Sequence, residues 1–470
     1  MVGARAILAM AMAAAVAGCA AAGPDYRLPG EAVVNAPPAQ GAFLSGGAAT
    51  SVEPPPDHWW KLFDDPVLDG LIERALAANT DLRIAEANLE RSDALLVEAR
   101  TGRQVDGLAD VETSWAQPSA EAVMQHVRPP EHQIYNAGIS ISYDLDLFGG
   151  IRRGIEAAGA DSEAAIAARD LARVNVTAET TRAYADVCNA GYQADVLRRV
   201  IAVQEEDLRL TRILIAHGRS PRYEQERQQG ALESTRSRLP QLEARQRNGA
   251  YRLATLMGLP PARFDRKLLD CRSPLKLRAL LPVGDGQTML KRRPDVRAAE
   301  RRLAAATARI GVATAALYPD IRLGASIGST GAGADLLSPL TNRFGVGPMI
   351  SWNLRRGTTR ARIAQAEAQS RASLAAFDGT VLTALREVET ALDNYAADLD
   401  RLAGLRAARD QAARVARQTR ELRRGGRIGG LAALDAERAL TAAEQAAAQA
   451  EADVNSDQIA VFLALGGGWA

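Results

Sequence analysis

The chain has 470 residues, and its 57 basic and 56 acidic side chains leave a net charge of +1. This balance gives no electrostatic reason to expect binding to nucleic acid or to an anionic membrane surface. Alanine is abundant and aromatic residues make up only 4%, which is typical of long, closely packed helices rather than of a compact enzyme. Beyond residue 18 no apolar run reaches the roughly 18 to 20 residues that a spanning helix needs, so any membrane crossing must use strands.

The first 18 residues have the layout of a bacterial lipoprotein signal peptide. Arg5 precedes an almost wholly apolar run over residues 6–17, and small residues lead directly into Cys19. In this pattern the thiol is acylated and becomes the first residue of the mature protein, so we predict a lipid on Cys19. An ordinary signal peptide that happens to contain a cysteine is the alternative. Ala20 stands where an aspartate would be the usual inner-membrane retention signal, which favours the outer membrane.

Residues 19–65 are predicted to form a lipidated N-terminal tether, because they are rich in proline, glycine and alanine to about Pro56. The chain then repeats itself once. Residues 81–89 return as residues 295–303, with an acid, a base, a glutamate and a leucine in register. The predicted organisation is a first repeat over residues 66–258, a linker over 259–293 and a second repeat over 294–470.

Each repeat is expected to form a helix, two strands, a long helix, a tight turn and a returning helix. The strands are expected near residues 105–115, 135–147, 320–329 and 344–354, where apolar and polar residues alternate. Strands of about ten residues have the length of a tilted transmembrane strand. A soluble, half-buried sheet would alternate in the same way, but the lipoprotein signal favours the membrane.

Four strands cannot stand alone in a bilayer, because their unpaired edge groups would find no water there. Several copies must therefore close one barrel. Two copies would give about eight strands and a filled interior, whereas three would give about twelve strands and a lumen lined by the polar strand faces. We therefore predict a homotrimer.

The long helices are expected over residues 150–217 and 357–424, which contain no proline. Helices of this length run on the order of 100 Å and would extend into the periplasm. They end in glycine-bearing turns at residues 217–221 and 425–430 and return as antiparallel hairpins. The predicted fold class is mainly α-helical with a membrane β-barrel part: three copies would form a helical tunnel and complete a barrel of about twelve strands.

Six sequence motifs occur together in the order expected for one family. They are Cys19 with Gly23-Pro24-Asp25-Tyr26, the run from Trp59 to Pro66, Asp144 to Gly149, Arg292 to Glu300, Leu434-Asp435-Ala436, and Ala464 to Trp469. Together they resemble the TolC-like outer-membrane efflux proteins, specifically the NodT-type lipoproteins that serve resistance-nodulation-division (RND) pumps. The resemblance spans essentially the whole mature chain and implies a trimeric channel that accepts substrates from an inner-membrane RND transporter through a periplasmic adaptor.

Two departures from the family pattern are visible. Family members often have a proline where the first helix enters its strand, as Pro319 does in the second repeat, but residues 102–105 of the first repeat contain none. The second turn is also unusually rich in glycine, where an aromatic residue would often precede it. Both departures concern local rigidity, and the second concerns the detail of gating.

The resemblance also implies a periplasmic gate formed by a ring of leucines and a ring of acids on the helix after the second turn. By their distance from Gly426 these residues would be Leu431 and Asp435, whose spacing of four places them on one helical face. Three copies would then form a dewetted constriction beside a ring that attracts cations. A core leucine and a solvated aspartate in an ordinary hairpin are the alternative.

The two turns mark the tips on which an adaptor is expected to dock. The tip residues concerned are Gly218, Arg219, Gly426 and Arg427. For the two arginines, a merely solvated turn position is the alternative. Glu224, six residues after Gly218, is a further candidate for an acidic channel mouth.

Neither catalysis nor a metal site is predicted. Residues 324–328 match the Gly-x-Ser-x-Gly pattern, but Ser326 lies within an alternating strand rather than at the sharp strand-to-helix turn that a nucleophile needs. The histidines show no zinc-binding spacing, and no phosphate-binding loop occurs. Apart from the covalent lipid on Cys19, no cofactor is expected. Cys188 and Cys271 could form a disulfide or remain buried thiols.

The function predicted from these observations is an outer-membrane exit duct of a tripartite efflux pump that passes small molecules such as drugs. Two alternatives remain open from the sequence. Within the same fold, the chain could be the outer-membrane duct of a type I protein-secretion system. From a different class, it could be a lipid-tethered periplasmic scaffold without a pore, against which the amphipathic strands argue.

Overall fold

The computed structural model describes residues 21–467, apart from residues 46, 118, 122, 123, 125, 278, 336 and 337. The predicted signal peptide, Cys19 and residues 468–470 lie outside this description. The chain forms two compact units. The first contains the described residues up to Pro29, with Leu89–Ala165 and Ala298–Phe377; the second contains Gly30–Asn88, Ile166–Arg297 and the residues from Asp378 onward. Each unit thus draws on both sequence repeats, because the long helices pass from one unit into the other.

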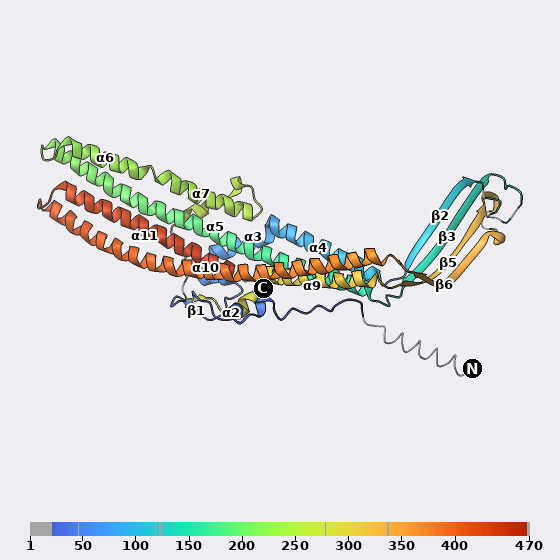
Figure 1. Ribbon diagram of the computed structural model, residues 1–470. Coiled ribbons are helices and arrows are strands. Elements are labelled where there is room, and N and C mark those ends of the chain that lie inside the picture. Colours follow the sequence, from blue (N-terminus) through green and yellow to red (C-terminus); the bar gives the residue numbers. More distant parts are fainter. Residues whose placement is uncertain are drawn as a thin grey trace. The chain divides into compact units, whose positions relative to one another are not determined.

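Four antiparallel strands form the sheet of the first unit, in the order β2-β3-β5-β6 (Figure 1). Their bounds are β2 Asp106–Ala116, β3 His132–Asp144, β5 Asp320–Ala332 and β6 Asn342–Ser351. Within the described residues, β2 pairs with β3 and β6 pairs with β5 in this sheet, so each is an edge strand. An exposed strand edge offers a row of backbone donors and acceptors to a further strand.

The register divides the sheet into an apolar and a polar face. Ile139 lies opposite Ala109 of β2 and Ile327 of β5, and Ile327 lies opposite Phe344 of β6. Phe344 is 86% exposed and Ile327 is 65% exposed. Large apolar side chains left open over several neighbouring strands indicate a surface that meets lipid or another apolar partner.

The first unit also contains the greater part of α4 (Thr80–Thr101) and α9 (Pro294–Ala315), with the beginnings of α5 (Gly150–Ala216) and α10 (Arg356–Arg424). The N-terminal residues of this unit are held on these helices. Tyr26 packs against a cluster of buried alanines on α5 and α9, and its hydroxyl donates to Glu300 Oε1 at 3.0 Å. Asp25 forms an ion pair of 2.7 Å with Arg153.

The second unit consists mainly of two helical hairpins (Figure 1). The first joins α5 (Gly150–Ala216) to α6 (Arg222–Arg236) and α7 (Leu239–Leu256). The second joins α10 (Arg356–Arg424) to α11 (Gly430–Ala464). Among the described residues, no helix is both long enough and apolar enough to cross a bilayer.

Small residues bring these helices close together. Gly249 of α7 lies against α5, where an added Cβ atom would come within 2.7 Å of a methyl group of Val187. Ala183 and Ala250 are completely buried. The alanine-rich composition therefore has the structural consequence expected from the sequence, because small side chains permit a close approach of the helix backbones.

The returning arms of the two hairpins differ. Ser237 and Arg238 separate α6 from α7, whereas α11 runs for 35 residues without interruption. Pro240 accounts for the interruption, because its ring nitrogen has no hydrogen to donate to the carbonyl one turn earlier. The backbone at Ser237 and Arg238 keeps right-handed helical angles, so the arm is locally weakened rather than redirected by a loop.

The segment expected to be an extended tether is instead folded into the second unit from Gly30 onward. A short strand β1 (Thr50–Ser51) pairs in parallel with β4 (Leu281–Pro282), and the backbone N–H of Val33 donates to Asp378 at 3.0 Å. The buried ring of Trp59 stacks on Phe462, with centroids 4.7 Å apart. Burial of such a large aromatic surface outweighs the flexibility suggested by the surrounding prolines and glycines.

The segment between the two repeats is folded as well. It contains two short 3-10 helices and α8 (Gly286–Arg292). Cys271 in this segment forms a disulfide with Cys188 of α5, which answers the question that the sequence left open. The Gln246 side chain reinforces this attachment by donating to the Leu269 carbonyl at 3.0 Å.

Candidate functional site

The predicted first tip is a glycine-terminated helix end. Gly218 has a φ of +64°, the left-handed conformation that glycine adopts without steric cost. Its N–H donates to the Ile215 carbonyl at 3.0 Å, and the N–H of Arg219 reaches back to the Leu214 carbonyl at 2.8 Å. This pair of bonds is the Schellman motif, which satisfies the last carbonyls of a helix.

The second tip repeats this geometry. Gly426 has a φ of +69°, its N–H donates to the Arg423 carbonyl at 3.0 Å, and the N–H of Arg427 donates to the Leu422 carbonyl at 2.9 Å. Both glycines have open space where a Cβ atom would stand. The two tips therefore present the same backbone shape, with an arginine immediately after each glycine.

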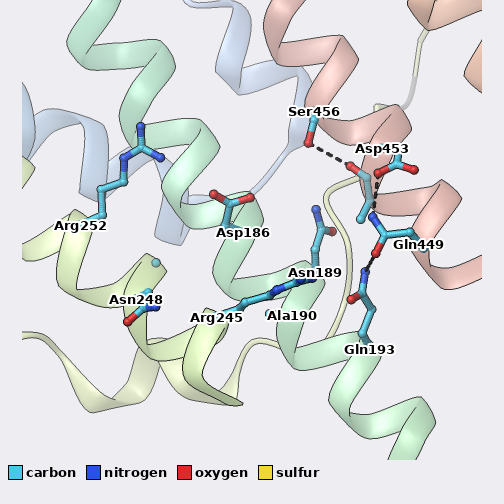
Figure 2. A pocket seen from close by; sticks show the side chains of 12 residues that line it. Asp186, Asn189, Ala190, Gln193, Arg245, Asn248, Arg252, Gln449, Asp453 and Ser456 are labelled. Atoms are coloured by element: carbon cyan, nitrogen blue, oxygen red, sulfur yellow. Dashed lines mark hydrogen bonds between the residues drawn. The ribbon is translucent and has the colours of Figure 1, made fainter. Parts of the chain in front are cut away.

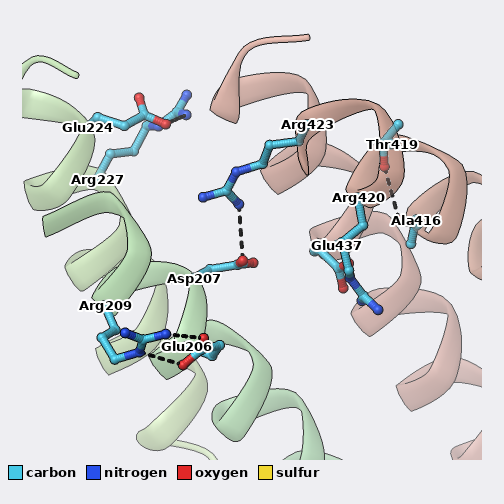
Figure 3. A network of polar contacts seen from close by, with 10 residues as sticks. All are labelled: Glu206, Asp207, Arg209, Glu224, Arg227, Ala416, Thr419, Arg420, Arg423 and Glu437. Carbon is cyan, nitrogen blue, oxygen red and sulfur yellow. Dashed lines mark hydrogen bonds and ion pairs between the residues drawn. The ribbon is translucent and has the colours of Figure 1, made fainter. Parts of the chain in front are cut away.

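An ion pair joins the two hairpins close to these tips (Figure 3). Arg423 of α10 lies 3.0 Å from Asp207 of α5, and the two side chains are only 14% and 15% exposed. Their charges are therefore largely withdrawn from water and depend on each other. This contact was not predictable from the sequence, because 216 residues separate its partners.

Other ion pairs near the tips act within a single hairpin. Arg420 of α10 binds the mostly buried Glu437 of α11 and so ties the two arms of the second hairpin together. Glu224 is also buried and pairs with Arg227 at 2.8 Å (Figure 3). Glu224 therefore does not offer the free negative charge that an acidic channel mouth would need.

The two predicted gate residues lie near the start of α11. Leu431 follows the first residue of the helix, and Asp435 lies one turn further on. The Asp435 side chain is 60% exposed, and its nearest cation is Arg438 at 3.8 Å. The neighbouring Leu434 and Ala436 are buried, so α11 packs through them and leaves the Asp435 carboxylate available to solvent.

The polar face of the sheet carries hydroxyl, amide and guanidinium groups. Arg343 of β6 donates to Asn136 of β3 at 2.7 Å and to Thr330 of β5 at 3.0 Å, which links three strands. Ser326 lies in the middle of β5, paired with Ser140 on one side and Gly345 on the other. It therefore lacks the strained turn that exposes a catalytic serine.

A pair of carboxyl groups lies within the second hairpin. Burial and the hydrogen-bonded Asp398 of α10 raise the pKa of Asp457 of α11 to about 7. Arg401 forms ion pairs with Asp398 at 3.3 Å and with Asp453 at 2.9 Å, so it balances two of the three acids. Within the described part of the chain, no group of three or more His, Cys, Asp or Glu side chains is arranged to hold a metal ion.

Comparisons with known proteins agree with this architecture. Residues 71–259 and 286–467 match the family described as outer membrane efflux protein. The chain is 29% identical to nodulation protein T of Rhizobium leguminosarum bv. trifolii, a match that covers 80% of this chain and 79% of that protein. It is also 29% identical to the toluene efflux pump outer membrane protein TtgC of Pseudomonas putida, over 99% of this chain and 96% of the relative.

A solved structure of the outer-membrane channel OprN superimposes with a TM-score of 0.87, at 34% identity, over 95% of this chain and 99% of OprN. The predicted resemblance to TolC-like and NodT-type proteins, the fold class and the outer-membrane location are confirmed by these matches. The protein is an outer-membrane efflux channel and belongs to the outer membrane efflux protein family.

Proposed function

We propose that three copies of this chain form the exit duct of a tripartite pump. In this arrangement an inner-membrane transporter of the RND class supplies drugs or other small molecules, a periplasmic adaptor connects it to the duct, and the duct releases them outside. The observation that carries the proposal is the combination of an open-edged sheet, apolar on one face, with two long hairpins that end in matching turns.

The sheet supports closure by several copies. Edge strands β2 and β6 are 11 and 10 residues long, which suits a tilted strand that crosses a bilayer. In the proposed trimer, β6 of one copy pairs with β2 of the next, so the edges of the sheet disappear. The exposed apolar face with Ile327 and Phe344 would then meet lipid, and the polar face with Ser326 and Arg343 would line the lumen.

The hairpin tips support docking and gating. Gly218, Arg219, Gly426 and Arg427 would contact the adaptor, and the exposed Asp435 would form an acidic ring in the closed end of the duct. Leu431 would form the adjacent apolar constriction. Opening would shift the population between two packings of the hairpins, favoured by contacts that the adaptor makes only with the open one.

Cys19 would carry the lipid that holds the N-terminus at the membrane. Asp25 and Tyr26, only a few residues later, are fixed to the helices of the first unit. The lipid would therefore be attached through a short connection rather than through a long free tether. Replacing Cys19 by serine should abolish labelling by a palmitate analogue, while a serine at Cys188 should leave the labelling unchanged.

The test of the proposed function is a gene deletion in the native host. Intracellular accumulation of chemically diverse antibiotics, dyes and metal ions should rise for several compounds. The intact gene should restore export, and a gene that lacks the codons for the signal peptide, residues 1–18, should not. Unchanged accumulation across the panel, together with loss of an exported protein from the medium, would contradict the proposal and favour a protein-secretion duct.

The gate is tested separately on the purified protein in planar bilayers. Asp435→Asn should reduce the preference of the pore for cations over anions, because it removes one charge per copy from the constriction. Asp400→Asn is the matched control, since Asp400 is also exposed but lies on α10 far from the tip. Equal selectivity of wild type and the Asp435 variant would exclude Asp435 from the gate.

A further inference from the structure

A groove with a volume of about 470 Å³ lies on α5 between α7 and α11. This size is ordinary for a pocket that binds a small molecule. All of its lining residues belong to the second unit. They include Gln193, Val196 and Leu197 of α5, Arg238 and Arg245 beside or on α7, and Gln445 of α11.

The charge of this groove has one sign. Two arginines line it and no acidic residue does. Arg238 donates to the Gln445 amide oxygen at 3.0 Å, which directs it toward α11. Arg245 lies seven residues later and hence on the same side of α7, and within the described residues it has no ion-pair or hydrogen-bond partner. A guanidinium without an acidic partner suits a carboxylate, sulfonate or phosphate group.

The floor and the opposite wall favour an apolar body next to that anionic group. Val196 and Leu197 of α5 are buried beneath the groove, and three alanines of α11 contribute further apolar surface. Four glutamine side chains line the rest and offer hydrogen bonds of either polarity. An apolar floor with a few polar groups is the usual construction of a ligand site.

A neighbouring pocket of different charge, shown in Figure 2, adjoins the groove. The two share Gln193, Arg245 and Gln449, but the neighbour also contains Asp186 and Asp453. Asp453 forms an ion pair of 2.9 Å with Arg401. Arg245 therefore stands at the boundary between the two pockets, and the groove between Arg245 and Arg238 is the part that favours an anion.

The groove lies on the side of α5 that faces away from the segment carrying Cys271. Gly191 of α5 touches the Cys271 carbonyl, whereas the groove residue Gln193 lies two positions later. Two residues in a helix correspond to a rotation of about 200°. The segment that carries Cys271 therefore covers one side of α5, and the groove occupies the opposite side, where a passing solute could enter.

We propose that this groove binds organic anions that have an apolar body, with Arg238 and Arg245 holding the anionic group. Its role as a station for such substrates inside the duct rests on the proposed channel function. Binding itself does not depend on export, so the two proposals are tested apart.

The test uses the full-length protein in nanodiscs of uncharged phosphatidylcholine and isothermal titration calorimetry. The probes are naphthalene-2-sulfonate and the trimethyl-(2-naphthyl)ammonium cation, which share the aromatic body and differ in charge. Empty nanodiscs provide the blank. Wild type should bind the anion at least tenfold more tightly than the cation.

Arg245→Gln should weaken binding of the anion about tenfold or more, and Arg238→Gln severalfold, because each removes a positive charge from the groove. Arg245→Lys should retain most of the affinity. Arg247→Gln is the matched control: it makes the same chemical change on an exposed residue of α7 two positions away, and it should alter the affinity by less than twofold.

Three results would overturn the proposal: no binding of the anion to wild type, equal binding of anion and cation, or equal losses for the Arg245 and Arg247 variants. Anion binding with the expected variant pattern, combined with a deletion strain that exports normally, would instead contradict the channel proposal and leave the site intact.

Discussion

The ion pair between Asp207 and Arg423 provides the sharpest test of how the two hairpins are held together. Its atoms are 3.0 Å apart, and both side chains are about 85% withdrawn from solvent. Removing one partner from a buried pair costs about 3 to 5 kcal/mol, since the remaining charge is left uncompensated. The residual exposure of this pair places the expected cost nearer 2 kcal/mol.

Asp207→Asn preserves the shape of the side chain and leaves Arg423 unpaired. In the proposed gating mechanism opening separates the two hairpins, so a loss of about 2 kcal/mol in their packing would change the ratio of closed to open arrangements roughly thirtyfold. In planar bilayers, the open probability of the purified protein should therefore rise markedly. Arg423→Gln should have a similar effect, and the double variant should be no worse than either single variant, because both charges are then absent.

Glu206→Gln is the control, because Glu206 is the neighbour of Asp207 but pairs with Arg209 at the surface. Both of those side chains are more than half exposed, and exposed pairs contribute little. The reasoning is refuted if Asp207→Asn and Glu206→Gln change the open probability equally. It is also refuted if the effects of Asp207→Asn and Arg423→Gln simply add in the double variant.

Three further predictions concern stability. Replacing both Cys188 and Cys271 by serine removes the cross-link of a loop that spans 83 residues. The free energy of unfolding should fall by roughly 4.5 kcal/mol in the chain-entropy description. In thermal unfolding, dithiothreitol should lower the melting temperature of wild type and leave that of the variant unchanged. Gly218→Ala should destabilise the first tip by about 1 kcal/mol, because Gly218 has a positive φ. Gly379→Ala, in the interior of α10 where a Cβ atom has open space, should stabilise the helix by about 0.5 to 1 kcal/mol. Local hydrogen exchange should become faster at the first tip and slower around Gly379, and a change in the same direction at both sites would contradict this expectation. Burial and Asp398 raise the pKa of Asp457 from 3.8 to about 7, so the folded protein binds this proton more tightly than the unfolded chain does. Stability should therefore fall as the pH rises from about 4 to 7. Asp457→Asn should flatten this dependence in unfolding midpoints measured across that range.

The general architecture was predictable because it depends on periodic features of the sequence. Alternation of apolar and polar residues indicated four strands, and the absence of proline indicated two long helices. Glycines at positions 218 and 426 indicated the turns, because a helix often ends at a residue in the left-handed conformation and that residue is usually glycine. These are local properties of the chain, and the duplication of the sequence allowed each to be recognised twice.

Contacts between distant segments were not predictable in the same way. The proline-rich stretch before Pro66 looked like a tether because nothing near it in the sequence reveals that Trp59 will stack on Phe462. The disulfide could not be predicted without knowing that the segment around Cys271 lies beside Cys188. The arginines at positions 238 and 245 have visible helical spacing, but their groove exists only because α11 supplies the opposite wall.

The break between α6 and α7 gives the two hairpins different mechanical properties. In the second hairpin, a displacement at Gly430 travels to Ala464 through one uninterrupted hydrogen-bonded rod. In the first hairpin, Pro240 cannot donate one of the backbone hydrogen bonds that would join α6 to α7, so bending concentrates near Ser237 and Arg238. A symmetrical pull on both tips would therefore be converted into unequal movements: the first hairpin would flex partway along its arm, and the second would swing as a lever.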